Sequence, residues 1–193
     1  MKKLFDGKEW EKVKLSEIIE FEKGKKPKVM FGEQKPGYSP YLSTDYLRNG
    51  NETKFVNSSE AVVMVNDGDL VLLWDGSNAG EFFEGKKGVL STTMVKFELK
   101  TEIDKKYLFY FLKTKESFIQ SQTNGTGIPH VDRKVLLNLD IVLPPLPEQK
   151  RIAEILSTLD KKLSIQSSQK KKLGRVKQGL MNDLLTGKKR VNL

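Results

Sequence analysis

The chain has 193 residues, enough for one well-packed domain plus an extended element but not for two ordinary enzyme domains. Hydrophobic residues make up 37% and charged residues 31%, which excludes a disordered or collagen-like chain. The absence of cysteine and the single histidine, His130, exclude disulfides, thiolate nucleophiles and histidine-rich metal sites. The sequence has no apolar run of membrane-spanning length and no secretory apolar stretch at its start, so we expect a cytoplasmic protein without a membrane partner.

The net charge of +9 is unevenly distributed. Residues 147–193 contain twelve Lys/Arg against four Asp/Glu, whereas residues 1–146 contain twenty-two against twenty-one. A basic segment favours a polyanionic partner, because neutralised phosphates release their counterions. A solvated helix face explains the C-terminal charge equally well. The near-neutral remainder would have to bind DNA through a local patch, for which the candidates are Lys23, Lys25, Lys26 and Lys28.

The first third of the chain predicts short elements. Residues 10–24 indicate a strand that enters a short helix, with Ser16 as a possible cap. Residues 31–60 are rich in Gly, Pro and Asn, so we expect mostly loop with short elements such as 41–43.

The middle of the chain changes from strand to helix patterns. Apolar, β-branched runs at 61–65, 69–74 and 89–99 predict strands. Residues 104–122 carry an apolar stripe of helical period, with Asp104 placed to cap the helix.

A loop with a short helical start at 131–136 follows, and then a strand at LDIVLPP. Pro147 suits the first turn of a helix, where Glu148 favours the positive helix end. The long helix predicted from there carries a heptad seam that is polar at Gln166, Lys170 and Lys177. Its apolar members are Ile152, Leu156, Leu159, Leu163, Leu173, Leu180 and Leu184.

Such a helix raises the question of what covers its apolar seam. Continuous from Pro147 to Leu185, it would be about 58 Å long at ~1.5 Å per residue. Leaving its Leu and Ile side chains in water forfeits about 1.5–3 kcal/mol apiece, so the pattern favours a partner helix. The alternative is a hairpin at 164–172 that packs the two apolar halves together.

Catalytic patterns are weak. A base-modifying methyltransferase needs a glycine-rich cofactor loop and an Asn/Asp-Pro-Pro-aromatic tetrapeptide, and the sequence has neither. Asp75, Glu84 and Lys86 fit the spacing of a metal-dependent nuclease. The same acid-x-Lys pattern recurs throughout this lysine-rich chain, so it discriminates little. We expect no catalytic site and no metal site in this chain.

Several segments together carry a resemblance to a known family. They are WEKVKLSEI, YLSTDYLRNG, VNDGDLVLLWDGSNAG, KKYLFYFLKT, GTGIPHV, LLNLDIVLPPLPEQKRIAEILSTLD and KLGRVKQGLMNDLLTGKKRV. With these segments the chain resembles the specificity subunit of type I restriction-modification systems, and the PPLPEQKRIAEIL and GLMNDLLTG segments are the most specific. Typical members carry two target recognition domains and two long helices, whereas this sequence resembles a half-length form with one of each.

The resemblance implies an α+β fold, in which a mixed α/β target recognition domain precedes a long helix that forms an antiparallel coiled coil. The corresponding regions are 1–146 for the DNA-binding domain, 147–187 for the spacer and dimerisation helix, and 188–193 for a basic tail. The implied partners are double-stranded DNA and the methylation and restriction subunits. S-adenosylmethionine, ATP and Mg would then belong to those partner subunits, with no cofactor in this chain.

Within the recognition domain, side chains that reach base edges give specificity and phosphate contacts fix register. Trp74, which could wedge between bases, more often belongs to a core in such a position. Ordinary turn chemistry is the competing explanation for Ser77, Asn78 and Thr126. The phosphate candidates are Lys23, Lys25, Lys26, Arg133 and Lys134, and the base-edge candidates are Ser43, Thr44, Arg48, Ser77, Asn78, Thr126 and His130.

Two chains with antiparallel helices would place identical domains about a two-fold axis, so we expect a homodimer that reads an interrupted inverted repeat. A heterodimer with another half-subunit would give an asymmetric site. A metal-dependent nuclease and a coiled-coil adaptor that binds only protein are the alternative functions.

Overall fold

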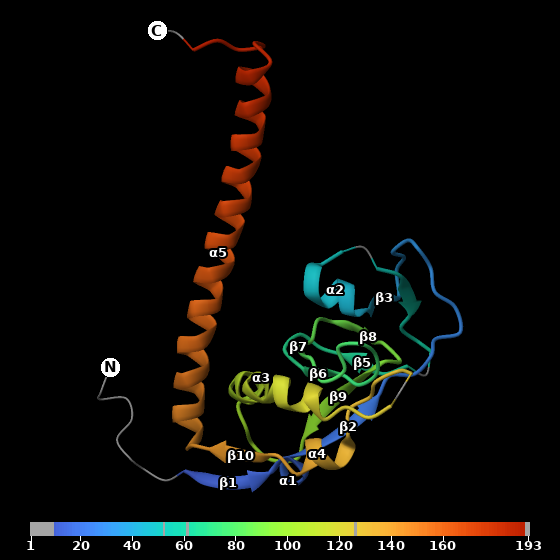
Figure 1. The fold of residues 1–193 in the computed structure, drawn as a ribbon. Coiled ribbons are helices and arrows are strands. Elements are labelled where there is room, and N and C mark those ends of the chain that lie inside the picture. Colours follow the sequence, from blue (N-terminus) through green and yellow to red (C-terminus); the bar gives the residue numbers. More distant parts are fainter. Residues whose placement is uncertain (1–9, 52, 61, 126, 192–193) are drawn as a thin grey trace. The chain divides into compact units, whose positions relative to one another are not determined.

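The computed structural model describes residues 10–51, 53–60, 62–125 and 127–191, and its ribbon is drawn in Figure 1. Contacts divide the chain into two units, one up to Lys150 and one from Arg151 onward. Sheets and helices in the first unit, followed by a long C-terminal helix, confirm the predicted α+β class.

The first unit alternates short strands and helices. Its elements are β1 (Glu11–Lys14), α1 (Leu15–Ile18), β2 (Ile19–Lys23), β3 (Tyr38–Leu42), α2 (Thr44–Asn49), β4 (Phe55–Asn57), β5 (Met64–Val65), β6 (Leu70–Leu73), β7 (Phe82–Glu84), β8 (Gly88–Leu90), β9 (Met94–Leu99), α3 (Lys105–Ser121), α4 (Arg133–Leu137) and β10 (Asp140–Leu143).

The described strands form three sheets. One is antiparallel with the order β2-β9-β6-β7. A second has the order β4-β3-β8-β5, in which only β3 and β8 are parallel. β1 and β10 form an antiparallel pair, which brings the start of the domain beside its end.

The core has two clusters, one on each face of the sheet that contains β6. Leu70 and Leu72 of β6 belong to the cluster that packs under α1, α3 and α4. Val71 and Leu73 belong to the second cluster, with residues of β3 and β8. Because successive side chains of a strand point to opposite faces, β6 is buried on both sides, which explains its uninterrupted apolar sequence.

The predicted helix at 104–122 is confirmed as α3, and the Asp104 carboxylate accepts the backbone N–H of Tyr107 at 2.8 Å as its cap. The predicted cap at Ser16 is wrong. α1 begins at Leu15, and its N-cap is Lys14, two residues before Ser16, with the Lys14 backbone N–H donating to the Glu17 carboxylate at 3.2 Å.

The segment 31–60, expected to be mostly loop, contains β3, α2 and β4. α2 was not predicted, because its six residues are too few to show a helical apolar period. β7 was likewise missed, since a strand of three residues gives almost no alternation.

The last helix, α5 (Leu146–Leu185), is continuous and about 60 Å long at ~1.5 Å per residue. It passes through 164–172 without a break, so the predicted hairpin alternative is wrong. It ends where Gly187 takes a left-handed φ of 72°. No helix among the described residues has the length and apolarity needed to cross a membrane.

Candidate nucleic-acid interface

Two loops lie side by side and bring several predicted base-edge residues together. The loop after β6 contains Ser77 and Asn78, and the loop before α4 contains His130. The Gly76 N–H donates to the Pro129 carbonyl at 2.9 Å, and the Val131 N–H donates to the Trp74 carbonyl at 3.0 Å. These bonds fix the two loops against each other, forming what we call the paired loops, residues 74–80 and 124–131 without the undescribed residue 126.

His130 is exposed, and its backbone holds the second loop closed. Its N–H donates to the Asn124 carbonyl at 2.8 Å, and the Asn124 N–H donates to the His130 carbonyl at 2.9 Å. Both backbone groups are therefore satisfied, which leaves the imidazole side chain as the part available to a ligand. Thr126, another predicted base-edge residue, lies outside the described residues.

The end of β2 joins the paired loops through an ion pair. Lys23 Nζ lies 2.7 Å from the Asp75 carboxylate. On the same strand, the centroid of the Phe21 ring lies 5.1 Å from that of Trp74, and Arg133 Cζ lies 5.0 Å from the Phe21 centroid. Trp74 is half-buried against the main core, which supports the core role and not the base wedge.

Arg48 connects α2 to the same region. Its Nε lies 3.0 Å from each oxygen of the Glu81 carboxylate, and its Nη2 also contacts Glu81. With its amide oxygen turned toward Arg48, Asn78 accepts from Arg48 Nη2 at 2.8 Å. The Glu81 hydrogen bond raises the pKa of Arg48, so the guanidinium is a fixed, permanently charged donor group.

The other predicted residues of α2 and α4 serve the helix ends. The Ser43 hydroxyl caps α2 by accepting the Tyr46 N–H at 3.1 Å, and Thr44 is the first helical residue. Arg133 and Lys134 open α4, whose cap is Asp132.

Asp132 ties α4 to the second of the paired loops. Its carboxylate accepts the backbone N–H groups of Lys134 and Val135 and the side-chain amide of Asn124. The Val135 bond and then the Asn124 bond are the main causes that lower the pKa of Asp132, so this cap is ionised at neutral pH. The start of α4 is thereby fixed relative to the loop that carries His130.

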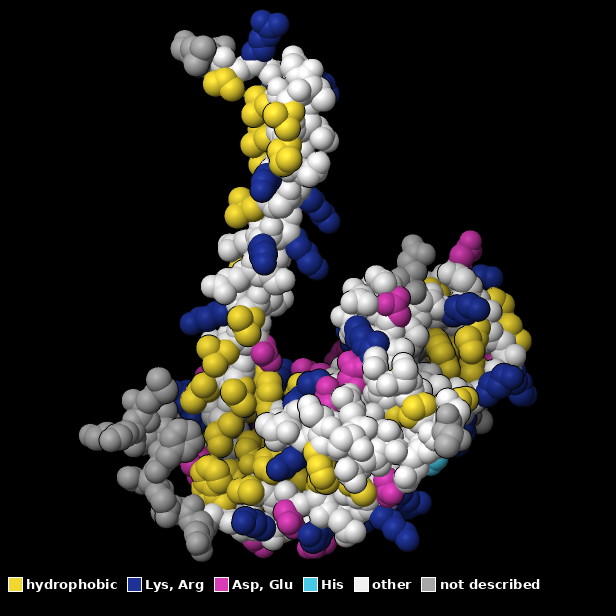
Figure 2. Space-filling model, in the orientation of Figure 1, with side chains coloured by type: hydrophobic (Ala, Val, Ile, Leu, Met, Phe, Trp, Pro, Cys, Tyr) yellow, Lys and Arg dark blue, Asp and Glu magenta, His cyan; other side chains and the backbone are white. Residues whose placement is uncertain are grey.

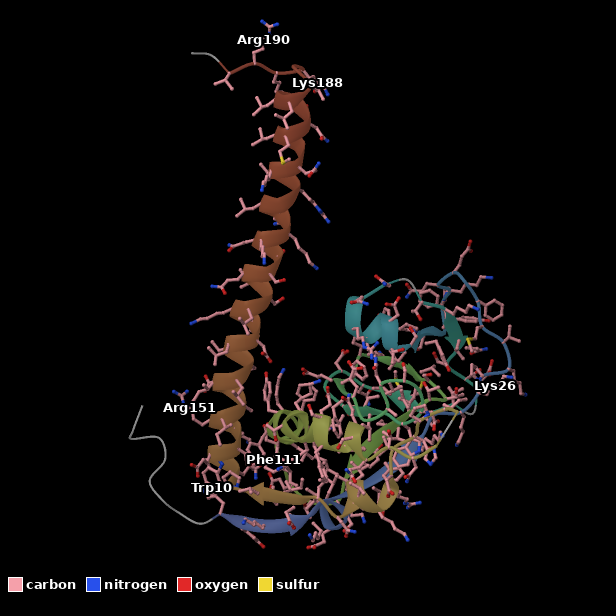
Figure 3. All side chains as sticks on the ribbon, in the orientation of Figure 1. Trp10, Lys26, Phe111, Arg151, Lys188 and Arg190 are labelled. Atoms are coloured by element: carbon pink, nitrogen blue, oxygen red, sulfur yellow. The ribbon has the colours of Figure 1, made fainter. Side chains whose placement is uncertain are left out.

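Apart from Lys23, which pairs with Asp75, the predicted phosphate contacts fall into two groups. Arg133 and Lys134 lie beside the paired loops, as described above. Lys25 and Lys26 are exposed in the segment that follows β2, and Figure 3 labels Lys26 there. Lys25 lies 3.5 Å from Glu22, an exposed pair of little energetic weight.

Sequence reasoning missed the acidic residues that hold this site. Asp75 was considered only as a metal ligand and Glu81 not at all, because their partners Lys23 and Arg48 lie 52 and 33 residues away. Each acid fixes a cation that the sequence presented as free. A local pattern cannot reveal such long-range pairs.

The residues considered for a nuclease are separately engaged. Asp75 pairs with Lys23, Glu84 pairs with Lys106 at 2.9 Å, and Lys86 lies over the Tyr46 ring. Across the part of the chain that the structure describes, no group of three or more His, Asp or Glu side chains could hold a metal ion.

The second unit carries the predicted seam on one helix. Leu159, Leu163 and Leu173 are 50%, 62% and 69% exposed in the single chain. Figure 2 shows apolar side chains along the visible face of α5, mainly toward its two ends, with Lys and Arg side chains between and beside them. Ile155 and Val176, both also exposed, flank the seam and widen the apolar stripe. The helix therefore presents a face suited to a second helix.

The first unit is thus a β-rich domain whose loops carry Arg, Lys, Asn and His side chains, and a long helix with an apolar seam follows it. The model of the type I restriction modification DNA specificity domain matches residues 7–175. The chain belongs to that family.

The chain is 55% identical over 179 residues to the type I restriction enzyme MjaVIII specificity subunit of Methanocaldococcus jannaschii, covering 92% of this chain and 42% of that protein. It is 26% identical over 130 residues to the EcoBI specificity subunit of Escherichia coli, covering 67% of this chain and 27% of that protein. This chain thus spans less than half the length of these relatives.

Solved structures share the fold. The S subunit of a type I restriction-modification system from M. genitalium superposes with a TM-score of 0.63 at 19% identity, covering 90% of this chain and 45% of that one. The HsdS subunit from Thermoanaerobacter tengcongensis gives a TM-score of 0.56 at 17% identity, covering 91% and 44%. At these identities the likeness concerns the fold.

Proposed function

We propose that this chain reads one half of a bipartite DNA site and positions methylation and restriction subunits there. The observation that carries the proposal is the joining of Arg48, Asn78 and His130 by α2 and the paired loops in a domain of this family. Arg and Asn are the side chains that make bidentate contacts with guanine and adenine in the major groove. Catalysis, with S-adenosylmethionine, ATP and Mg, belongs in this proposal to the partner subunits.

The seam supports a second part of the proposal, that two copies pair through α5 in antiparallel fashion. Each copy would cover the other's exposed leucines, and the two recognition domains would be related by a two-fold axis. Domains on one side of the duplex must lie about 34–36 Å apart or a multiple of it, and a helix of about 60 Å can span that distance. The site would then be an interrupted inverted repeat.

The test is to map methylated bases in cells that express this chain together with the methylation subunit of its type I system. We expect methylation at a single interrupted inverted repeat, and none in cells that express the methylation subunit alone. An asymmetric bipartite site would replace the homodimer with a heterodimer of two different half-subunits. Methylation that does not depend on this chain would overturn the proposed function.

Two other functions are separated by simple assays on the purified chain. Magnesium-dependent cleavage of duplex DNA by the chain alone would identify a nuclease. A complex with the methylation subunit that fails to retain duplex DNA at moderate salt would identify a protein-only adaptor.

A further inference from the structure

The segment between β2 and β3, residues 24–37, is held in place although it contains no helix and only a single bridge of strand type. At its start the Gly24 N–H donates to the Met94 carbonyl at 3.0 Å. Farther along, Phe31 and Phe55 exchange two backbone hydrogen bonds of 2.9 and 2.8 Å, and the Phe31 ring packs edge-on against Tyr38 at 5.1 Å.

Between these fixed points two apolar side chains face solvent. Pro27 is buried, and the Lys28 N–H donates to the Glu60 carboxylate at 2.9 Å. The next two residues, Val29 and Met30, are 51% and 36% exposed. Single exposed apolar residues are ordinary on protein surfaces, but two adjacent ones on a segment held at both ends form a fixed apolar tip. We call Val29 and Met30 the apolar tip.

The charged residues around the apolar tip indicate which class of partner it contacts. Residues 24–37 contain Lys25, Lys26, Lys28 and Lys35 against Glu33, and two further carboxylates contact the segment, Glu22 at Lys25 and Glu60 at the Lys28 N–H. Figure 2 shows Lys and Arg side chains interleaved with apolar ones at this end of the first unit. Lysine is depleted from protein–protein interfaces, whereas DNA-binding surfaces need it to contact phosphates. The surroundings of the tip therefore favour a nucleic acid over a protein.

The tip is also continuous with the interface described above. Lys23, the residue before Gly24, forms the ion pair with Asp75 in the paired loops. Apolar side chains such as Met are used by DNA-binding proteins to enter a groove or to wedge between base steps. We propose that the apolar tip enters a groove of duplex DNA beside the site read by the paired loops, with Lys26 and Lys28 on the flanking phosphates. This inference rests on the proposed DNA-reading function.

The test compares the salt dependence of DNA affinity for variants of the complex between this chain and its methylation subunit. The probe is duplex DNA that carries the sequence identified by the methylation mapping. An apolar contact releases few counterions on binding. The double variant Val29→Ser with Met30→Ser should therefore weaken binding about tenfold at every salt concentration between about 50 and 200 mM. The slope of the logarithm of affinity against the logarithm of salt concentration should stay unchanged. Lys26→Ala should instead lower the slope by about one.

Phe118→Ser is the matched control, because Phe118 on α3 is 51% exposed, as Val29 is. It should leave affinity unchanged. The proposal is overturned if the double variant binds DNA like the wild type, or if Phe118→Ser loses as much DNA affinity as the double variant. It is also overturned if the double variant no longer binds the methylation subunit, because the tip would then be a protein contact. Failure of the wild-type complex itself to retain the duplex would instead refute the proposed function.

Discussion

The Arg48 guanidinium on α2 is bound by the Glu81 carboxylate, which precedes β7, through Nε distances of 3.0 Å to both carboxylate oxygens. The side chains of Arg48 and Glu81 are 34% and 18% exposed. In the proposed function Arg48 reads a base, so the Glu81 carboxylate orients the guanidinium before DNA binds, and Arg48 exchanges this carboxylate for a base edge on binding.

Arg48→Ala should change which sequences are bound, whereas Lys25→Ala should weaken binding to all DNA alike. The reason is that a guanidinium bound to a base edge favours the correct base over a wrong one by about 1–3 kcal/mol, whereas an exposed lysine contacts only phosphates. The measurement is affinity for cognate and scrambled duplexes at matched salt. An equal loss on both duplexes for Arg48→Ala would remove this residue from the readout set.

Glu81→Gln should raise affinity for scrambled DNA and narrow the difference between cognate and scrambled duplexes. The substitution removes a negative charge from the interface and releases Arg48 from its fixed orientation. Glu84→Gln is the control, since Glu84 pairs with Lys106 instead. Unchanged discrimination in Glu81→Gln would show that the acid does not orient Arg48 for reading.

Gly24→Ala should destabilise the domain by about 1–3 kcal/mol, the usual range for overpacking. A Cβ on Gly24 would lie 2.0 Å from the Ser91 carbonyl oxygen and 2.8 Å from that of Leu90, and neither backbone atom can move aside cheaply. Gly32→Ala, with open space around its Cβ, should change stability by less than about 0.5 kcal/mol. Urea unfolding measures both, and equal midpoints for the two variants would contradict the close packing at Gly24.

The free energy of unfolding should decrease between pH 10 and 12, and Tyr107→Phe should remove the part of this decrease that comes from Tyr107. Burial raises the pKa of Tyr107 from 10.0 to about 12, and its hydroxyl donates to the Val142 carbonyl at 2.6 Å. Below pH 10 the phenol is neutral in both states. Above pH 10 the phenol ionises in the unfolded chain first. The free energy of unfolding therefore decreases as the pH rises toward and through the pKa of Tyr107 in the folded state.

Tyr107→Phe should also cost about 1 kcal/mol at neutral pH through the lost hydrogen bond. Urea unfolding at several pH values gives the comparison, and the difference between wild type and variant isolates this one phenol from the other titrating groups. A difference that stays constant up to pH 12 would contradict a raised pKa at Tyr107.

The sequence predicted the elements whose own residues carry a period. α3 has a 3.6-residue apolar stripe and a capping Asp104, and α5 has its heptad seam, so both were found. β6 was found because burial on both faces makes its sequence continuously apolar. α2 and β7 are too short for any period, and only tertiary packing defines them.

The site was predicted less completely, because its geometry depends on pairs that are distant in sequence. Arg48, Asn78 and His130 were chosen as donors on loops, and hydrogen bonds connect the segments that carry them. The acids that orient the cations, Asp75 and Glu81, have no local signature. The tip at Val29 and Met30 was likewise invisible, because exposure of an apolar residue is a property of the fold.

In the proposed homodimer, a second copy covers the seam of α5 in antiparallel orientation. Since the chain has no cysteine, single cysteines for spin labels can be introduced without background. Lys161, Ser168, Arg175 and Asn182 are exposed and repeat every seven residues, on the side of the helix opposite the seam. Their labels would leave the seam intact.

Pulsed dipolar spectroscopy on each singly labelled variant then measures the distance between the two copies. Antiparallel pairing predicts distances that increase on either side of the two-fold axis, because the separation along the helix axis grows by about 3 Å per residue, twice the helical rise. Equal distances at all four positions would show parallel helices. The absence of any dipolar coupling between copies would contradict the paired-helix account altogether.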